Sequence, residues 1–491
     1  MERLRRLLRS AWAAFTHRES WPATLAALGL SQVLTMVTSL LVAGSLSAEG
    51  FGTVSVARNF LMLAAVIFQL GLDLGLQRRL GEVGERAGEH FAEIRLLRLI
   101  CAGATLSALA ILGLGGSGLV ESYVVSHEGF SRVLLVTMIA LPFWVDLAVM
   151  GGAYRGILRP GPSLFAMSVI QPAARLTATV VSILLGEVLL AMPIGLIFGY
   201  GAAWMYLAAR ASRQFAVPPN RTSYDFSAVV RVLRFSIPLA FAVACTTLTR
   251  MLDLLALSYF APRIEVGRYS ATLLLAQMLL LVGAAKGQAI GTRVASAFAA
   301  RDMESLQSRL MNNIRLISIL AAPLFACFLF WGGRLDLLIG DSYRQDGIVV
   351  ILAVTYGLIA SVWGSFGLAL AMTNHYKLET AIIFAGLLIQ AAGCLVLVPN
   401  YGQAGAAAAS LITTIAILGM RCVAVHAVHR ILLRPDPLIW IAAALATAGL
   451  VYGLELLIGG RTVLSTAISC SATCAVYLLL ALGCNRRLRS L

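Results

Sequence analysis

Five ionisable residues stand out inside long apolar stretches of this 491-residue chain, and a sixth, Arg58, lies just inside the external end of another such stretch. On insertion scales, a charged side chain at the centre of a membrane helix costs about 2.5–3.5 kcal/mol, so such residues usually have a function. Arginine offers a planar fork of donors that matches phosphate oxygens, and a carboxylate beside a cation in a cavity can bind a proton or Na⁺. We therefore predict an anion-binding role for Arg58, Arg175, Arg250 and Lys286, and an ion-coupling role for Asp146 and Asp253.

The depths of these residues favour a single path across a membrane. At a rise of about 1.5 Å per residue, Lys286 lies nearest the cytoplasm, Arg175 near the middle and Arg58 nearest the outside. If they face one cavity, they form a ladder of positive charge for a pyrophosphate or an acidic sugar. A structural alternative stays open: Arg250 and Asp253 are three residues apart and could neutralise each other, while Arg58 and Lys286 could reach toward the interfaces.

The composition requires elements that cross a membrane. Hydrophobic residues make up 59% of the chain, charged residues only 12%, and the mean hydropathy is +0.86. A soluble domain is about 25% charged, and the apolar residues here fall in blocks of about 20, the length of a membrane-spanning helix. These numbers predict a polytopic α-helical membrane protein and exclude a disordered chain, a disulfide scaffold and a cytosolic enzyme. The eight cysteines lie in or beside apolar blocks and are interpreted as packing residues, without metal-ligand spacing.

Apolar blocks separated by charged breaks give fourteen candidate spans. Most of the 38 Lys and Arg then fall in segments placed in the cytoplasm, which supports the parsing and puts both termini there. A basic segment at residues 3–18 is expected to lie on the cytoplasmic surface. The least distinct break is Gly186-Glu187. The predicted spans are 23–46, 53–76, 96–118, 132–154, 163–185, 188–209, 234–260, 267–292, 313–333, 347–371, 377–398, 404–426, 437–458 and 463–484.

The chain also contains a weak internal repeat. An acidic residue, then Gly-x-x-Ser, follows the first span at Gly52 and the seventh span at Gly267. We therefore predict an all-α membrane protein of about 14 transmembrane helices, with two six-helix lobes related by a pseudo-two-fold axis around a central cavity, plus two C-terminal helices. The predicted domains are residues 1–216, 217–435 (an inter-lobe linker at 217–234, then spans 7–12) and 436–491.

Several short motifs, in this order, resemble Wzx-type polysaccharide flippases of the multidrug/oligosaccharidyl-lipid/polysaccharide exporter superfamily. The resemblance extends over about residues 20–435. The motifs are Gly71-Leu-Asp73-Leu-Gly75 before Arg78 and Arg79, Arg234-Phe-Ser-Ile-Pro238, Gly267-Arg-Tyr269-Ser270, and Val398-Pro399-Asn400-Tyr-Gly402-Gln-Ala-Gly405.

This resemblance implies a function in cell-surface polysaccharide biosynthesis, such as that of O-antigen. The implied cargo is an undecaprenyl-pyrophosphate-linked oligosaccharide, moved by alternating access from the cytoplasmic to the periplasmic leaflet of a bacterial inner membrane. Membrane lipids surround such a protein, which is expected to be a monomer without a cofactor. A glycan polymerase and a co-polymerase are candidate partners. Nucleic acid is not expected, because the arginines orient the spans.

Two other functions remain as alternatives. A drug or cation antiporter of the same superfamily would need carboxylates for its cargo, yet the first span, residues 22–46, contains no acidic residue. A polyprenol-dependent glycosyltransferase or polymerase would need catalytic carboxylates on a substantial external loop. The longest external loops, residues 119–131 and 333–346, are short and are interpreted as solvated connections, so we do not expect an enzyme.

Overall fold

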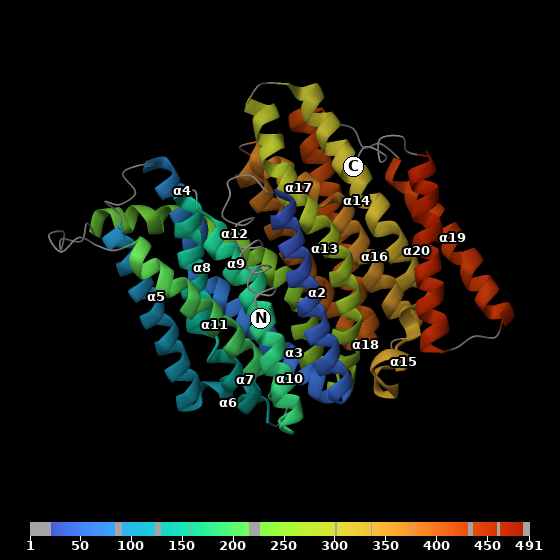
Figure 1. Cartoon of the computed structure of the whole chain (residues 1–491), viewed down its shortest axis with the longest axis horizontal. Coiled ribbons are helices and arrows are strands. Elements are labelled where there is room, and N and C mark those ends of the chain that lie inside the picture. Colours follow the sequence, from blue (N-terminus) through green and yellow to red (C-terminus); the bar gives the residue numbers. More distant parts are fainter. Residues whose placement is uncertain are drawn as a thin grey trace, which may run out of the picture. The chain divides into compact units, whose positions relative to one another are not determined.

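In the computed structural model, all the regular elements of the described residues are helices (Figure 1). Eleven helices in this part of the chain are long and apolar enough to cross a membrane, and Gly29–Ser45 and Ile468–Ala481 are shorter apolar helices. The predicted class, an all-α polytopic membrane protein, is therefore confirmed, while the count of fourteen spans and the pseudo-two-fold axis stay predictions. The described residues are 21–83, 91–122, 129–157, 159–215, 226–299, 302–334, 336–373, 375–430, 436–458 and 462–484.

The chain divides into two compact units. Unit 1 comprises the residues up to Leu46 together with Thr53–Met251, and unit 2 comprises Ser47–Gly52 together with Leu252–Leu491. The predicted domain boundary at 216–217 lies outside the described residues, as do the basic segment 3–18 and the first part of the predicted linker.

Unit 1 is built around a core where α8 meets η4 and α11. Buried side chains there include Leu147, Met150 and Tyr154 of α8 and Leu207 of α11. Glycines allow close approach elsewhere: a Cβ on Gly152 would overlap the backbone of Asp73 on α4. The elements are α2 (Trp21–Ser45), α3 (Ala48–Gln69), α4 (Leu72–Val83), α5 (Phe91–Ile111), η2 (Leu112–Gly116), α6 (Ser117–Val120), α7 (Phe130–Met138), α8 (Leu141–Gly156), α9 (Gly161–Phe165), η4 (Ala166–Ile170), α10 (Gln171–Leu184), α11 (Ala191–Gln214) and most of α12 (Phe226–Phe260).

The indistinct break between the fifth and sixth predicted spans is confirmed. The helix α10 ends at Leu184, and Gly186 takes φ +89°, a left-handed conformation that glycine adopts without steric cost. The amide of Glu187 donates to the carbonyl of Ser182, which closes the end of the helix. One glycine at the end of an apolar run is therefore enough to separate α10 from α11.

In unit 2, the predicted spans 377–398 and 404–426 are two helices that meet at a kink within α18. At Gly402, just after Pro399, φ +52° and ψ −126° are not helical. The elements are the end of α12, α13 (Arg263–Ala299), α14 (Met303–Trp331), η5 (Gly332–Arg334), α15 (Asp336–Ile339), η6 (Asp341–Tyr343), α16 (Gly347–Trp363), α17 (Ser365–Met372), α18 (Tyr376–His429), α19 (Asp436–Ile458) and α20 (Val463–Cys484).

The connection between α14 and α16 differs from the solvated loop that its sequence predicts. Tyr343 is fully buried and packs edge-on against Phe51, with 6.1 Å between ring centroids, and burial raises the pKa of its phenol. Arg268 Nε donates to the carbonyl of Ser342 at 2.8 Å. Tyr343 is a large aromatic side chain in a short polar connection, and it packs against apolar side chains. The segment is therefore part of the packed structure of unit 2.

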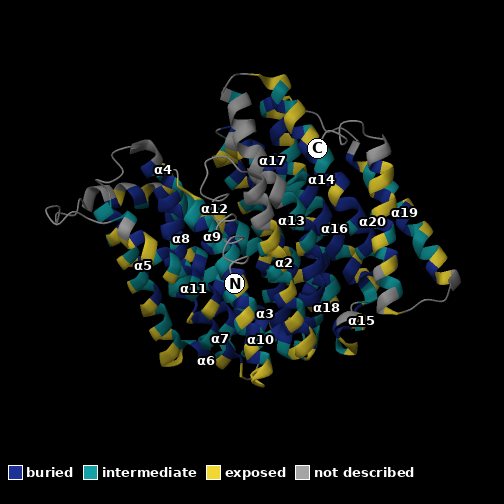
Figure 2. Ribbon diagram, in the orientation of Figure 1, coloured by how far each residue is buried: buried dark blue, intermediate teal, exposed yellow. Residues whose placement is uncertain are grey.

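The two C-terminal helices pack onto α14. Cys327 and Trp331 of α14, Ala448 of α19 and Tyr477 of α20 belong to one buried cluster. The other faces of α19 and α20 carry exposed apolar side chains, such as Leu450 and Leu479, as expected for positions that meet lipid (Figure 2). The tail beyond Cys484 lies outside the described residues.

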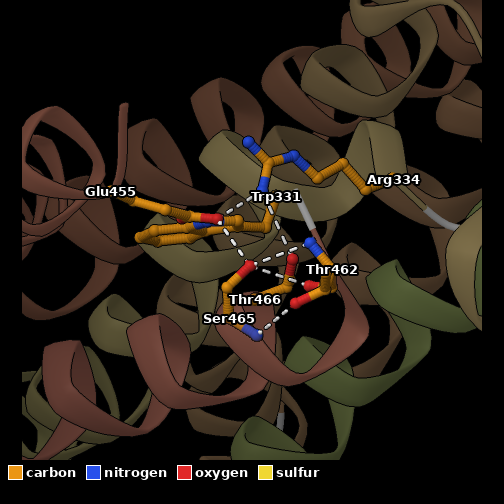
Figure 3. Close-up of polar contacts among 6 residues, drawn as sticks. All are labelled: Trp331, Arg334, Glu455, Thr462, Ser465 and Thr466. Atoms are coloured by element: carbon orange, nitrogen blue, oxygen red, sulfur yellow. Dashed lines mark hydrogen bonds and ion pairs between the residues drawn. The ribbon is translucent and has the colours of Figure 1, made fainter. Parts of the chain in front are cut away.

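A buried carboxylate joins these same three helices at one end (Figure 3). Glu455 of α19 is only 5% exposed and accepts hydrogen bonds from Trp331 Nε1 at 2.5 Å and Arg334 Nη1 at 2.6 Å. Ser465 Oγ of α20 adds a longer bond at 3.3 Å, and Arg334 also donates to Thr466 Oγ1 at 3.3 Å. We call these five residues the Glu455 cluster.

Candidate functional site

Arg175 is a buried cation on α10 with unused donors. Its side chain is 5% exposed, and its Nε and Nη2 atoms have no hydrogen-bond partner among the described residues. The π-helical turn η4 precedes α10, and Pro172, which lacks an N–H group, stands in the first turn of α10. Such turns are frequent at functional sites.

Two glycines hold α11 against the face of α10 that carries Arg175. A Cβ on Gly199 would meet Arg175 Cβ and the Gln171 carbonyl oxygen at 2.9 Å, and one on Gly195 would overlap Thr179 Oγ1. Residues four apart lie on one helix face. The glycines of α11 therefore form a small-xxx-small pattern that packs against the face of α10 formed by Gln171, Arg175 and Thr179. The position of Arg175 is therefore set by backbone packing.

A second arginine lies near Arg175. Arg58 of α3 interacts electrostatically with Arg175 and with Tyr200 of α11, and its Nε also has no hydrogen-bond partner in the described part of the chain. Tyr200 is itself stacked on Trp144, with 4.6 Å between ring centroids. No carboxylate of the described residues contributes to the charge environment of either arginine. Within the described part of unit 1, this pair of like charges thus has no counter-charge, which suits an anionic ligand.

The other two predicted cations differ from this pair. Arg250 is exposed on α12, although its sequence position deep in an apolar segment suggests burial. Lys286 lies on α13, but its side chain is outside the described residues. The structure therefore brings Arg58 and Arg175 into one neighbourhood, and the ladder of four cations facing one cavity stays a prediction.

Asp146 has a cationic partner that sequence reasoning missed. Arg98 of α5 donates from Nε and Nη2 to the two carboxylate oxygens of Asp146 at 2.6 and 2.7 Å, and Trp204 Nε1 of α11 donates at 2.7 Å. Arg98 stands two residues inside the predicted span 96–118, where an arginine is interpreted as interfacial. This carboxylate therefore joins α5, α8 and α11 through a bidentate ion pair.

Asp253 is buried with hydroxyl partners. Its side chain, on α12 in unit 2, is 2% exposed and accepts from Tyr269 Oη at 2.7 Å and Ser410 Oγ at 3.0 Å. The backbone amide of Leu254 donates at 2.7 Å. Within the described residues Asp253 makes no ion pair with Arg250, so the alternative of mutual neutralisation is wrong. Tyr269 belongs to a motif quoted above, but nothing in the spacing of the three residues predicts their contact.

The chain matches two family models. The model described as polysaccharide biosynthesis protein matches residues 18–295, more than half of the chain, and the MatE model matches residues 238–398. No curated protein matches the sequence.

Solved structures show the same fold at low sequence identity. A structure titled lipid II flippase MurJ, inward closed conformation, has a TM-score of 0.73 at 15% identity, covering 95% of this chain and 99% of that one. An inward-facing multidrug resistance MATE family transporter has a TM-score of 0.63 at 14% identity, covering 80% and 95%. A transporter of the same superfamily from Pyrococcus furiosus, whose title reports a binding pocket of reverse polarity, has a TM-score of 0.59 at 13% identity, covering 83% and 95%.

These matches agree with the resemblance found in the sequence at the level of the superfamily. Because the family model spans more than half of its length, this chain, whose helices are long enough to cross a membrane, belongs to the polysaccharide biosynthesis protein family.

Proposed function

We propose that this protein is a flippase for an undecaprenyl-pyrophosphate-linked oligosaccharide. It moves its cargo from the cytoplasmic to the periplasmic leaflet of a bacterial inner membrane by alternating access, with both termini in the cytoplasm. The proposal is supported by the family and by the fold shared with a lipid II flippase. The observation that carries it is the Arg58–Arg175 pair, whose buried donors lack acceptors. A monomer is proposed, with a glycan polymerase and a co-polymerase as pathway partners.

The cations would hold the charged headgroup. Arginine donors pair with two phosphate oxygens at once, which fixes the orientation of the ligand as well as its charge. Arg58 and Arg175 would form the main contact, and Arg250 and Lys286 would meet the same headgroup at other depths of the path. In this proposal the sugars need little specific recognition, because the pyrophosphate is common to every cargo of this class.

Substitution of Arg175 tests this role. Arg175→Ala is expected to reduce transport about tenfold to a hundredfold, because hydrogen bonds to charged groups contribute about 1.5–3 kcal/mol. The measurement is translocation of a fluorescent lipid-linked oligosaccharide in proteoliposomes. Arg132→Ala, which removes an exposed arginine of the same unit, is the control. Arg175→Lys should keep part of the activity, and full transport by Arg175→Ala would contradict the proposal.

Transport is proposed to be ion-coupled, with Asp146 and Asp253 as the coupling sites. Asp253 is the better suited of the two, because a buried carboxylate with hydroxyl partners and no ion pair can gain or lose a proton or Na⁺. Asp146 is already neutralised by Arg98, so an ion would have to replace that contact.

Substitution of Asp253 tests the coupling. Asp253→Asn keeps the shape and accepts hydrogen bonds, but it cannot bind a proton or a metal ion by charge. We expect the variant to lose the stimulation of transport by an imposed gradient, measured in proteoliposomes with proton or sodium gradients of either sign. Asp302→Asn, at the start of α14, keeps its capping function and serves as control. Stimulation equal to that of the unmodified protein would exclude Asp253 as the coupling site.

A drug or cation antiporter is the second candidate, favoured by the MatE match over residues 238–398 and by the fold shared with MATE transporters. An organic cation would need an unpaired carboxylate in its path. Asp253 of unit 2 is such a carboxylate, whereas in unit 1 the buried charged atoms that lack a hydrogen-bond partner among the described residues belong to arginines. Uptake of ethidium by energised proteoliposomes, with no movement of a lipid-linked glycan, would favour the antiporter. Sugar transfer or polymerisation by the purified protein would instead indicate an enzyme.

A further inference from the structure

Three cysteines gather where α20 packs against α14, although one of them is distant from the other two in sequence. Cys327 Sγ of α14 donates to the carbonyl oxygen of Cys470 at 3.6 Å and lies 3.9 Å from Cys474 Sγ. Cys470 and Cys474 are four residues apart, so they lie on one face of α20. All three are free thiols. The helix packing therefore brings oxidisable groups from two helices into direct contact.

The burial of these thiols differs between the two helices. Small side chains such as Ala326 of α14 and Ala481 of α20 belong to the same buried cluster as Cys327 and let the helices approach closely. Cys327 is only 3% exposed, whereas Cys470 and Cys474 are half-buried. A reagent dissolved in lipid or detergent therefore reaches the thiols of α20 first, and Cys327 is held beside them.

The geometry favours a bond between the helices over a bond within α20. A disulfide needs its two Cβ atoms about 3.5–4.5 Å apart, whereas residues four apart on a helix hold theirs about 5–6 Å apart. Cys470 and Cys474 are therefore unsuited to each other. The sulfurs of Cys327 and Cys474 must approach by about 2 Å to reach the length of an S–S bond. A change of χ1 rotamer moves a sulfur over a comparable distance.

We propose that Cys327 and Cys474 form a site of oxidative modification, at which a disulfide bond ties α20 to α14. The oxidant is a disulfide of a second molecule. The Cys474 thiolate attacks one sulfur of that disulfide and forms a mixed disulfide, and the Cys327 thiolate then attacks Cys474 Sγ. One S–S bond breaks in the reagent and one forms in the protein. The protein gives up two electrons to the reagent, which leaves as two thiols carrying two protons.

The bond would make the attachment of α20 covalent. In the reduced protein, α20 is held to α14 by apolar packing around Tyr477 and by the Glu455 cluster. Cys327 lies one turn before Trp331, which binds Glu455, so the disulfide would reinforce the same three-helix contact from a position farther along α14. The proposal is independent of any cargo, and it holds or fails whether or not the protein moves a glycan.

The test is reaction of the purified full-length protein with dithiodipyridine, a disulfide that enters membranes. A lone cysteine releases one thiopyridone and keeps a thiopyridyl group, whereas a pair that closes a disulfide releases two and keeps none. We expect peptide mass spectrometry without reduction to find Cys327 joined to Cys474. Cys422 of α18, half-buried and without a thiol contact among the described residues, should keep its thiopyridyl group and is the internal control.

Two variants assign the bond. Cys474→Ala should abolish it, and Cys470→Ala, one turn earlier on the same face, should retain it. Hydrogen exchange of α20 should be at least about tenfold slower in the oxidised unmodified protein than in the reduced one, because a disulfide constrains the open chain. A phosphine reductant should restore the original rate.

Several results would overturn the proposal. They are stable thiopyridyl groups on both Cys327 and Cys474, a bond from Cys327 to Cys470 instead, no reaction of these thiols in the folded protein, and unchanged exchange in α20 after oxidation. The unmodified protein carries the decisive measurements, so a variant that fails to fold leaves the test intact.

Discussion

Glu455→Ala should destabilise unit 2 by about 3–5 kcal/mol, the cost of removing one partner from a buried ion pair. Glu455 is 5% exposed, and its removal leaves the guanidinium of Arg334 and the indole N–H of Trp331 without their main acceptor. The loss should concentrate in the C-terminal helices, because the carboxylate joins α19 to α14 and α20. Hydrogen exchange of α19 and α20 is the measurement, together with the unfolding transition in detergent.

Three variants separate this effect from a general loss of charge. Glu304→Ala, at an exposed position of α14, should change stability by no more than about 0.5 kcal/mol. Ser465→Ala, which removes the 3.3 Å bond to Glu455 and the contacts of Ser465 Oγ with the backbone of Thr462, should cost about 1 kcal/mol. Glu455→Gln can still accept a hydrogen bond from Trp331, so its loss of stability should lie between that of Ser465→Ala and that of Glu455→Ala. Unchanged exchange in α19 and α20 of Glu455→Ala would show that apolar packing alone holds the two helices.

Asp146→Ala is expected to destabilise unit 1 by about 3 kcal/mol. The substitution leaves Arg98 partly buried without its bidentate partner and removes the acceptor of the Trp204 indole. The expected cost is at the lower end for a broken buried pair, because the Arg98 side chain is 27% exposed and can recruit water. Chemical or thermal unfolding of the purified protein measures the change.

A double substitution distinguishes a structural from an ion-coupling role for Asp146. Arg98→Met with Asp146→Leu should recover most of the lost stability, because replacing a buried ion pair by apolar residues of similar volume is often neutral. Arg95→Ala, at an exposed position of the same helix, is the control for loss of an arginine. If the stable double variant transports cargo with unchanged dependence on the ion gradient, Asp146 is not a coupling site. Single variants as stable as the unmodified protein would contradict the structural role.

The elements of this protein could be predicted from sequence because their signals are local. Apolar blocks of membrane length force helices, since a lipid environment leaves backbone groups no other partner. The break at Gly186-Glu187 depends on a few adjacent residues and is found where it was expected. Arg58 and Arg175 are conspicuous for the same reason, because a basic residue in an apolar run needs no knowledge of its neighbours to be noticed.

The partners of the charged residues were decided by tertiary structure alone. Arg98 and Asp146 are 48 residues apart, and Asp253 and Ser410 are 157 residues apart, on helices whose rotation no spacing determines. Arg250 and Asp253 show the same limit within one helix, since the first is exposed and the second is buried. Sequence fixes which residues are costly in a membrane, because that cost belongs to each residue. Whether a neighbour removes that cost depends on how the helices pack. Asp146 gains a partner in this way, whereas Arg175 has none for its Nε and Nη2 atoms among the described residues.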